Sequence, residues 1–189
     1  MLNIPGEDKD KVLHYYNESH PYYKMDIAIV GAGNSAVDVA LDTFRKGAKS
    51  VTMIIRENEI GKNIKYWVRP DIMNRIENKE INVFYESIIT EIKDRSIIIN
   101  SKSKDIEIEN DFVLAMTGYQ PNYKILENLG VEIKKDEFKT PFYSEETMET
   151  NVKGVFIAGV ICGGLKTNKW FIENSRVHSE KIISQITKV

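Results

Sequence analysis

A run of small residues at positions 31–36 has the spacing that lets a protein backbone approach a pyrophosphate. Gly31 permits a tight turn, Gly33 leaves room for the phosphates, and Ala36 lets the following helix pack closely on the preceding strand. A helix that begins here offers free N–H groups and the positive end of its dipole to an anion. The pattern predicts a dinucleotide site made by Gly31, Gly33, Asn34, Ser35 and Ala36.

The segments around this turn supply the context that such a site needs. Residues 26–30 are an apolar run that predicts a buried strand, residues 35–46 have helical spacing, and Gly47 ends that helix. Residues 50–55 predict a second buried strand. Strand, glycine turn, helix and strand form a βαβ unit with a parallel sheet. A tight turn that binds nothing is the alternative that this context disfavours.

The end of the second strand bears on which nucleotide is bound. An acidic residue there favours NAD, whereas an arginine accepts the 2′-phosphate of NADP. Arg56 favours NADP, although Glu57 follows it directly, and Lys65 adds positive charge nearby. A solvated surface arginine is the alternative for Arg56. Trp67 either covers the nicotinamide or packs in a core or an interface.

The rest of the chain predicts further α/β structure. Pro70 suits the first turn of a helix, and the polar turns after Ser87 part short strands of an antiparallel meander. The expected elements are a helix over 71–78, a strand over 81–85, meander strands over 88–92, 96–99 and 105–109, a buried strand over 111–116, a helix over 122–129, a buried strand over 154–159 and a helix over 169–188.

Composition limits the classes of function. The 189 residues are 42% hydrophobic and 29% charged with a net charge of -2, which is typical of a chain that buries a core. We expect no nucleic-acid partner, because the cations form no stripe, and no membrane segment, because no apolar run is long enough. The single cysteine, Cys162, excludes an intrachain disulfide and a Cys-x-x-Cys pair and fits a reducing cytoplasm.

No side chain is assigned a catalytic or metal-binding role. The three histidines, His14, His20 and His178, share no spacing that indicates a metal site or a triad. A catalytic thiol needs nearby positive charge, which the sequence does not show for Cys162, so an inert buried cysteine is favoured.

The chain resembles the two-dinucleotide flavoproteins of the thioredoxin reductase type, in which a pyridine-nucleotide domain is inserted into an FAD domain. The glycine turn resembles their NADPH fingerprint, residues 115–121 resemble the segment that returns to the FAD domain, and residues 150–159 resemble the late FAD-contacting strand. The resemblance implies cofactor contacts at Thr117, Gly118, Gly159 and Val160.

Within that superfamily the chain is most similar to the YpdA-type bacillithiol disulfide reductases. Gly159 is followed by Val160, where thioredoxin reductases carry Gly-Asp, and this also looks like the YpdA pattern. The resemblance implies FAD and NADPH, electron flow from nicotinamide through flavin to a low-molecular-weight disulfide, and a cytoplasmic homodimer. Its further carriers are residues 4–8, 20–23, 34–38, 64–65 with 67, 115–119 and 171–174.

The resemblance also predicts the organisation of the chain. Residues 1–22 are expected to be an inter-domain crossover, residues 23–121 the NAD(P)H-binding domain, and residues 122–189 the C-terminal part of an FAD domain. No strand with a glycine turn for FAD precedes them, so we expect Met1 to be an internal methionine of the parent sequence. The chain alone is then expected to be inactive and to expose an apolar face at Val155, Ile157, Val160 and Ile161. The alternatives are a stand-alone NADPH-binding module and a non-catalytic fragment that assembles with a complementary chain.

Overall fold

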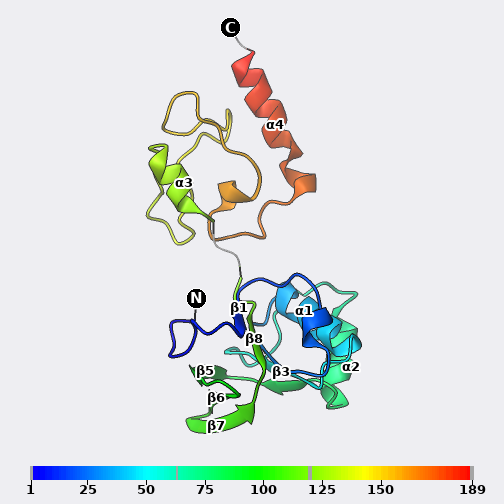
Figure 1. Ribbon diagram of the computed structural model, residues 1–189. Coiled ribbons are helices and arrows are strands. Elements are labelled where there is room, and N and C mark those ends of the chain that lie inside the picture. The colour runs from blue at the N-terminus through cyan, green and yellow to red at the C-terminus, as the bar shows by residue number, and fades with distance from the viewer. Residues whose placement is uncertain (1, 63, 119–120, 188–189) are drawn as a thin grey trace. The chain divides into compact units, whose positions relative to one another are not determined.

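The computed structural model describes residues 2–62, 64–118 and 121–187, and the chain forms two compact units, Met1–Gly118 and Tyr119–Val189 (Figure 1). The expected return segment, 115–121, contains two residues outside the described ranges, and the expected end of the last helix at Lys188 also lies outside them. No helix among the described residues is long and apolar enough to cross a membrane.

A five-stranded parallel sheet forms the centre of the first unit. Helix α1 (Asn34–Arg45) joins its central strand to the next one, which confirms the predicted βαβ unit. In spatial order the strands are β1 (Val12–Leu13), β8 (Phe112–Ala115), β2 (Asp26–Val30), β3 (Ser50–Ile54) and β4 (Asn82–Phe84).

Strand β1 was not predicted, and it comes from the segment expected to be an inter-domain crossover. Val12 pairs with Val113 and Leu13 with Leu114, so residues of the 1–22 segment extend the sheet of the first unit. A strand of two residues is too short to show the alternation by which strands are recognised in a sequence.

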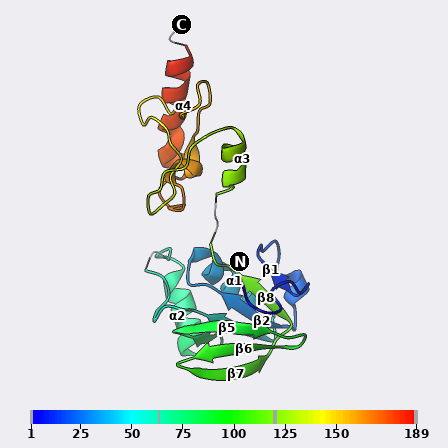
Figure 2. The same ribbon diagram turned by 90° about the vertical axis from the view of Figure 1, so that its left-hand side faces the viewer.

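Both faces of the parallel sheet are buried, because neighbouring side chains along a strand point to opposite faces. Ile27 and Ile29 of β2 pack in one cluster with α1 and α2 (Arg69–Glu77), whereas Ala28 packs in the other with the predicted meander. Figure 1 shows the two helices beside the parallel sheet, and Figure 2 shows the meander strands lying together as a second sheet. The meander is antiparallel as predicted, with β5 (Ser87–Ile92), β6 (Ser96–Ser101) and β7 (Lys104–Glu109).

Each unit contains a short 3-10 helix. In the first unit it is η1 (His20–Tyr22), and in the second it is η2 (Gly159–Gly163). The predicted helices of the second unit form as α3 (Tyr123–Asn128) and α4 (Ile172–Ile186). Its core consists of Leu126, Val131, Met148, Ile157 and Cys162.

The strand predicted over residues 154–159 is wrong. Phe156 forms only an isolated antiparallel bridge with Glu149, and the chain then enters η2 (Gly159–Gly163). The apolar run correctly indicated burial, but a strand also needs a neighbour that pairs with it along its length. The expected exposed apolar face is also partly wrong, since Ile157 lies in the core while Val160 is exposed.

Candidate nucleotide-binding site

Gly31 is required by the fold of the first unit. Its φ of 134° lies in a region that residues with a side chain rarely adopt, and its N–H donates to the Ile54 carbonyl at 3.1 Å. A Cβ atom at this position would lie 2.4 Å from the Met116 carbonyl oxygen, just beyond the end of β8. The tight turn after β2 therefore depends on glycine through contacts within the protein itself.

Gly33 lacks a side chain for a different reason. Its φ of −87° suits any residue, and a Cβ atom there would have no neighbour within 4 Å. It is the N-cap of α1, and no side chain caps this end of the helix. The space in front of Gly33 is therefore open and faces the positive end of the helix dipole, which is the arrangement that binds phosphate.

Ala36 and Ser35 occupy the first turn of α1 in different ways. Ala36 is fully buried, and its Cβ would lie 3.4 Å from a Cβ at Gly31, so a larger side chain would push the helix away from the turn. Ser35 is exposed beside the open space. The small residue at position 36 thus allows close packing of the helix, whereas the one at position 35 faces the open space.

The order of the strands places this turn at a reversal of the sheet. The α1 crossover leads from β2 to β3 on one side, whereas β8 lies on the other side, with Ala115 paired to Val30. Ligands of open α/β sheets bind at such switch points, outside the carboxyl ends of the strands. Thr117 and Gly118 follow β8 at the same edge and are exposed.

The described residues 60–62 and 64–69, which we call the strap, are hydrogen-bonded to the glycine turn. The Gly61 N–H donates to the Ala32 carbonyl at 3.0 Å, and the Lys65 N–H donates to Asn34 Oδ1 at 2.9 Å. Arg69 Nη1 donates to the Gly61 carbonyl at 3.0 Å and so braces the strap from its far end. A Cβ at Gly61 would lie 2.8 Å from the Ala32 oxygen, so the strap can come this close to the glycine turn only with glycine at position 61.

Gly61 was missed in the sequence analysis. The signal available was a glycine within a loop of larger residues, and nothing in the sequence links it to Ala32.

The predicted cations of the site each have an acidic partner. Lys65 Nζ lies 2.8 Å from Asp38 Oδ2, and Arg56 Nε lies 2.8 Å from Glu57 Oε1. The hydrogen bond from Arg56 lowers the pKa of Glu57 below its ordinary value. The Arg56 side chain is 82% exposed, so its ion pair is weak and can be exchanged for another anion.

Trp67 is 64% exposed and makes an edge-on contact with Tyr66, at 4.9 Å between ring centroids. Packing in the core of this chain is therefore wrong, whereas packing in an interface and covering the nicotinamide stay predictions. The strap that carries Trp67 is held by main-chain hydrogen bonds near the glycine turn, and its aromatic side chains face outward.

Gly159 and Val160 belong to the second unit and not to the unit that holds the glycine turn. Gly159 has a φ of 77°, and its N–H donates to Nδ1 of the buried His178 at 3.0 Å. Burial, followed by the charges of Lys181 and Lys169, lowers the pKa of His178, which matches its role as a neutral acceptor. His178 thus fixes the backbone of the turn at Gly159.

Cys162 is buried in the same region. Burial raises the pKa of its thiol to about 11, and its Sγ lies 4.0 Å from His178 Nδ1. A neutral, enclosed thiol is a poor nucleophile, which favours the inert role over the catalytic one. Among the described residues, no group of three or more His, Cys, Asp or Glu side chains could hold a metal ion.

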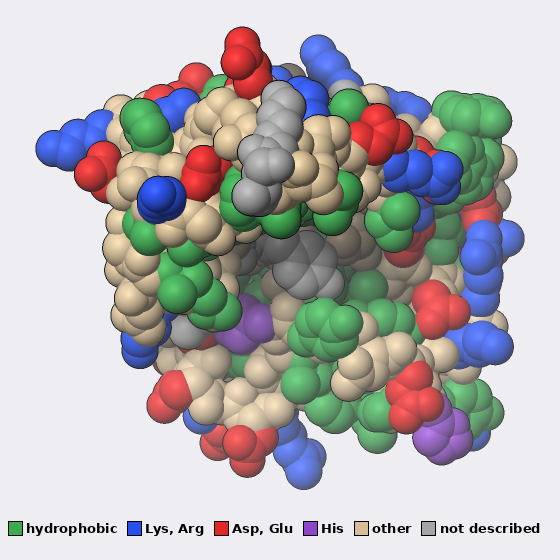
Figure 3. All heavy atoms as spheres, turned by 90° about the horizontal axis from the view of Figure 1, so that it is seen from above, with side chains coloured by type: hydrophobic (Ala, Val, Ile, Leu, Met, Phe, Trp, Pro, Cys, Tyr) green, Lys and Arg blue, Asp and Glu red, His purple; other side chains and the backbone are tan. Residues whose placement is uncertain are grey.

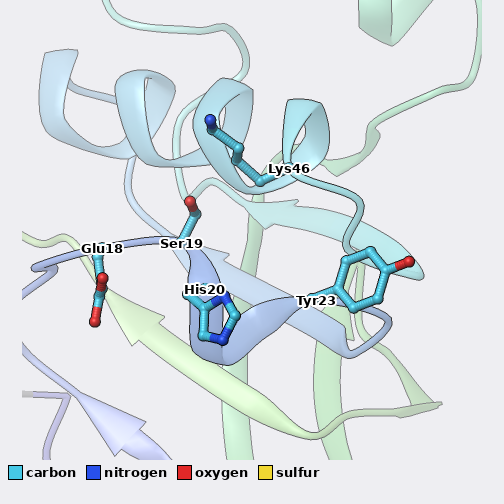
Figure 4. A pocket seen from close by; sticks show the side chains of 5 residues that line it. All are labelled: Glu18, Ser19, His20, Tyr23 and Lys46. Carbon is cyan, nitrogen blue, oxygen red and sulfur yellow. The ribbon is translucent and has the colours of Figure 1, made fainter.

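A surface hollow of about 420 Å³ lies away from the glycine turn (Figure 4). Glu18, Ser19, His20 and Tyr23 line it from the segment before β2, and Lys46 lines it from the end of α1. These elements belong to the amino edge of the parallel sheet, and the labelled side chains in Figure 4 do not converge on one point. On the face seen in Figure 3, Lys and Arg are interspersed with Asp and Glu, so positive charge is not gathered there.

Comparison with known proteins identifies the family. A family model described as pyridine nucleotide-disulphide oxidoreductase matches residues 1–159. The chain belongs to this family.

Individual relatives agree with the family and confirm the expected resemblance to the YpdA type. The chain is 45% identical over 188 residues to "Bacilliredoxin reductase Bdr" of Bacillus subtilis (strain 168), which covers 99% of this chain and 57% of that protein. Two solved structures of "Bacillithiol Disulfide Reductase Bdr (YpdA)" match with a TM-score of 0.93 each. The Bacillus cereus protein is 40% identical, with 98% of this chain and 57% of that chain covered. The Staphylococcus aureus protein is 36% identical, with 98% and 58% covered.

The chain therefore spans just over half the length of these relatives. A thioredoxin reductase of T. acidophilum, with 17% identity and a TM-score of 0.69, shares the fold and confirms the predicted α/β class.

Proposed function

We propose that this chain binds NADPH at the glycine turn and supplies the NADPH-binding part of an FAD-dependent reductase of a low-molecular-weight disulfide. The open space at Gly33, in front of an uncapped helix end, is the observation that carries the proposal. A side chain at position 33 would fill that space without touching the protein. Its absence supports a ligand at this position.

Different residues around the turn bind different parts of NADPH. The first N–H groups of α1 hold the pyrophosphate, and Ser35 lies beside them as a further donor. Arg56, at the end of β3, binds the 2′-phosphate by leaving Glu57, which makes the site selective for NADPH over NADH. Lys65 supplies a second cation from the strap. When bound, NADPH supplies the hydride and FAD carries its electrons to the disulfide.

Thr117, Gly118, Gly159 and Val160 are proposed cofactor contacts on the basis of the family resemblance. The positive φ values of Gly118 and Gly159, at 95° and 77°, favour glycine at both positions. A Cβ atom at either would meet nothing within 4 Å in the chain, so both backbones present open space to a ligand. The homodimer and the cytoplasmic location are proposed on the same resemblance.

The names of the relatives differ in the disulfide they specify. One is a bacilliredoxin reductase, and the solved structures are of bacillithiol disulfide reductases. We propose the low-molecular-weight disulfide as the substrate. A stand-alone NADPH-binding module is the second candidate, and it is favoured by the fact that the complete glycine turn lies within one compact unit.

Calorimetric titration of the purified chain with NADPH tests the proposal. We expect saturable binding, with NADH weaker, because only NADPH carries the 2′-phosphate. Absence of heat up to millimolar NADPH would contradict the site. NADPH oxidation is then followed after addition of FAD and bacillithiol disulfide, with an oxidised bacilliredoxin as the competing substrate. The chain alone is expected to bind NADPH without turnover. Turnover of the small disulfide once the missing FAD-binding part of a relative is added supports the reductase, whereas no turnover in that mixture favours the module.

A further inference from the structure

The strap places Lys65 along the first two turns of α1. Its N–H is bound to the side chain of Asn34, the first residue of the helix, and its ammonium group lies 2.8 Å from the Asp38 carboxylate, one turn further on. The lysine is therefore held at two points beside the end of the helix that faces the open space at Gly33. The side chains of Lys65 and Asp38 are 39% and 45% exposed, so solvent and ligands reach both.

This arrangement has a consequence for any anion bound at the helix end. Asp38 lies about one helical turn behind the first N–H groups, a distance of roughly 5–6 Å along the axis. The negative charge of Asp38 offsets the positive charge of Lys65 while the two are paired, so the pair presents little net charge to a phosphate. An ion pair this exposed is weak, and a phosphate carries more charge and more acceptor oxygens than a carboxylate.

We propose that Asp38 and a nucleotide phosphate compete for Lys65, so that Lys65 changes partner when the nucleotide binds and Asp38 lowers the affinity of the site. The inference rests on the proposed function, because it needs a phosphate-bearing ligand at the glycine turn. Asn34 keeps the backbone of the strap in place during the exchange, since it holds the main chain of Lys65 and not the ammonium group. Asp38 is thus a residue that sets affinity without touching the nucleotide.

The test is a double-mutant cycle on NADPH affinity, measured by calorimetry with the whole chain. Asp38→Asn removes the competing charge and should tighten NADPH binding by about twofold to fivefold, the usual strength of an exposed ion pair. Lys65→Met should weaken binding. In the Lys65→Met background, Asp38→Asn should change affinity by less than about twofold, because no ammonium group remains to be released. Asp42→Asn, on the same helix one turn further from the site, is the matched control. It should have little effect on NADPH affinity, because asparagine can still accept the hydrogen bond that Asp42 receives from the Tyr16 hydroxyl.

The outcomes separate the explanations. An equal gain from Asp38→Asn with and without Lys65 means simple repulsion of the phosphate by Asp38 and overturns the exchange. Weaker binding by Asp38→Asn means that Asp38 positions Lys65 for the phosphate and also overturns it. If the unmodified chain binds no NADPH, the proposed function itself has failed. Circular dichroism and a melting curve of each variant show that α1 and the strap-bearing unit remain folded.

Discussion

Replacing Gly33 with leucine should abolish NADPH binding and leave the fold intact. No atom of the chain lies within 4 Å of the position that a Cβ would take, and the φ of −87° is open to leucine. The new side chain would occupy the space in front of the helix end. A pyrophosphate could then no longer reach the N–H groups of α1.

The expected loss can be worked out from the hydrogen bonds at stake. Each charge-assisted hydrogen bond contributes about 1.5–3 kcal/mol, so losing two of them costs about 3–6 kcal/mol, or at least about a hundredfold in Kd. The effect on stability is smaller. Leucine is a poorer N-cap than glycine by about 1 kcal/mol, which lowers the melting temperature of a unit of this size by roughly 5 °C.

Gly31→Ala is the matched control, because it changes a glycine of the same motif by a single methyl group. Its Cβ would lie 2.4 Å from the Met116 carbonyl oxygen, at a φ of 134°. We expect a loss of at least about 3 kcal/mol in the free energy of unfolding, so the melting temperature should fall by about 10 °C or more. Calorimetric NADPH titration and thermal unfolding by circular dichroism, on both variants, give the two readouts.

Gly33→Leu should therefore mainly lower NADPH affinity, whereas Gly31→Ala should mainly lower the free energy of unfolding. Gly33→Leu protein that binds NADPH within threefold of the unmodified chain would refute the phosphate site. Gly33→Leu protein that loses more stability than Gly31→Ala protein would refute the assignment of open space to Gly33 and of the fold requirement to Gly31.

Two further predictions concern Arg56 and His178. Arg56→Ala should weaken NADPH binding by about 1.5–3 kcal/mol and leave NADH nearly unchanged, and equal losses for both nucleotides in calorimetry would contradict a 2′-phosphate role. His178 is neutral in the fold with a lowered pKa, so the unfolded chain binds more protons and the second unit should lose stability as the pH falls through about 6.5. Fluorescence of Trp170, which contacts His178, should report this unfolding in a Trp67→Phe background. His178→Asn, which keeps an acceptor for Gly159, should remove the pH dependence, and an unchanged dependence would contradict the reasoning.

The sequence was sufficient for those elements whose signal is local. The apolar runs at β2 and β3, with a glycine turn between strand and helix, predicted the βαβ unit because each feature is contained within a few residues. The strand expected over 154–159 failed because its formation depends on a neighbour that the run itself does not specify. Core packing of Trp67 failed for the same reason, since an aromatic residue packs in a core only where the fold provides a partner.

Helix α4 shows a further limit of periodicity. The spacing of apolar residues predicted the helix correctly, but the residue it buries is His178, while Ile183 and Ile186 are more than half exposed. The capping of this helix was also not predicted. Asn174 accepts a hydrogen bond from the Phe171 N–H at 2.7 Å and donates to the Lys169 carbonyl at 3.0 Å, so a side chain inside the helix fixes its entry.

The candidate site depends on contacts that the glycine motif does not contain. Gly31 is constrained by the Met116 carbonyl after β8, and Ala32 accepts the hydrogen bond by which Gly61 fastens the strap. A sequence with the same residues at 31–36 but a bulky residue at 61 could not bring the strap to this turn, because a Cβ there would lie 2.8 Å from the Ala32 oxygen. It would keep the phosphate-binding helix end and lose the position of Lys65. The motif alone therefore predicts where a pyrophosphate would bind, whereas the charges proposed to distinguish one dinucleotide from another are set by segments distant in the sequence.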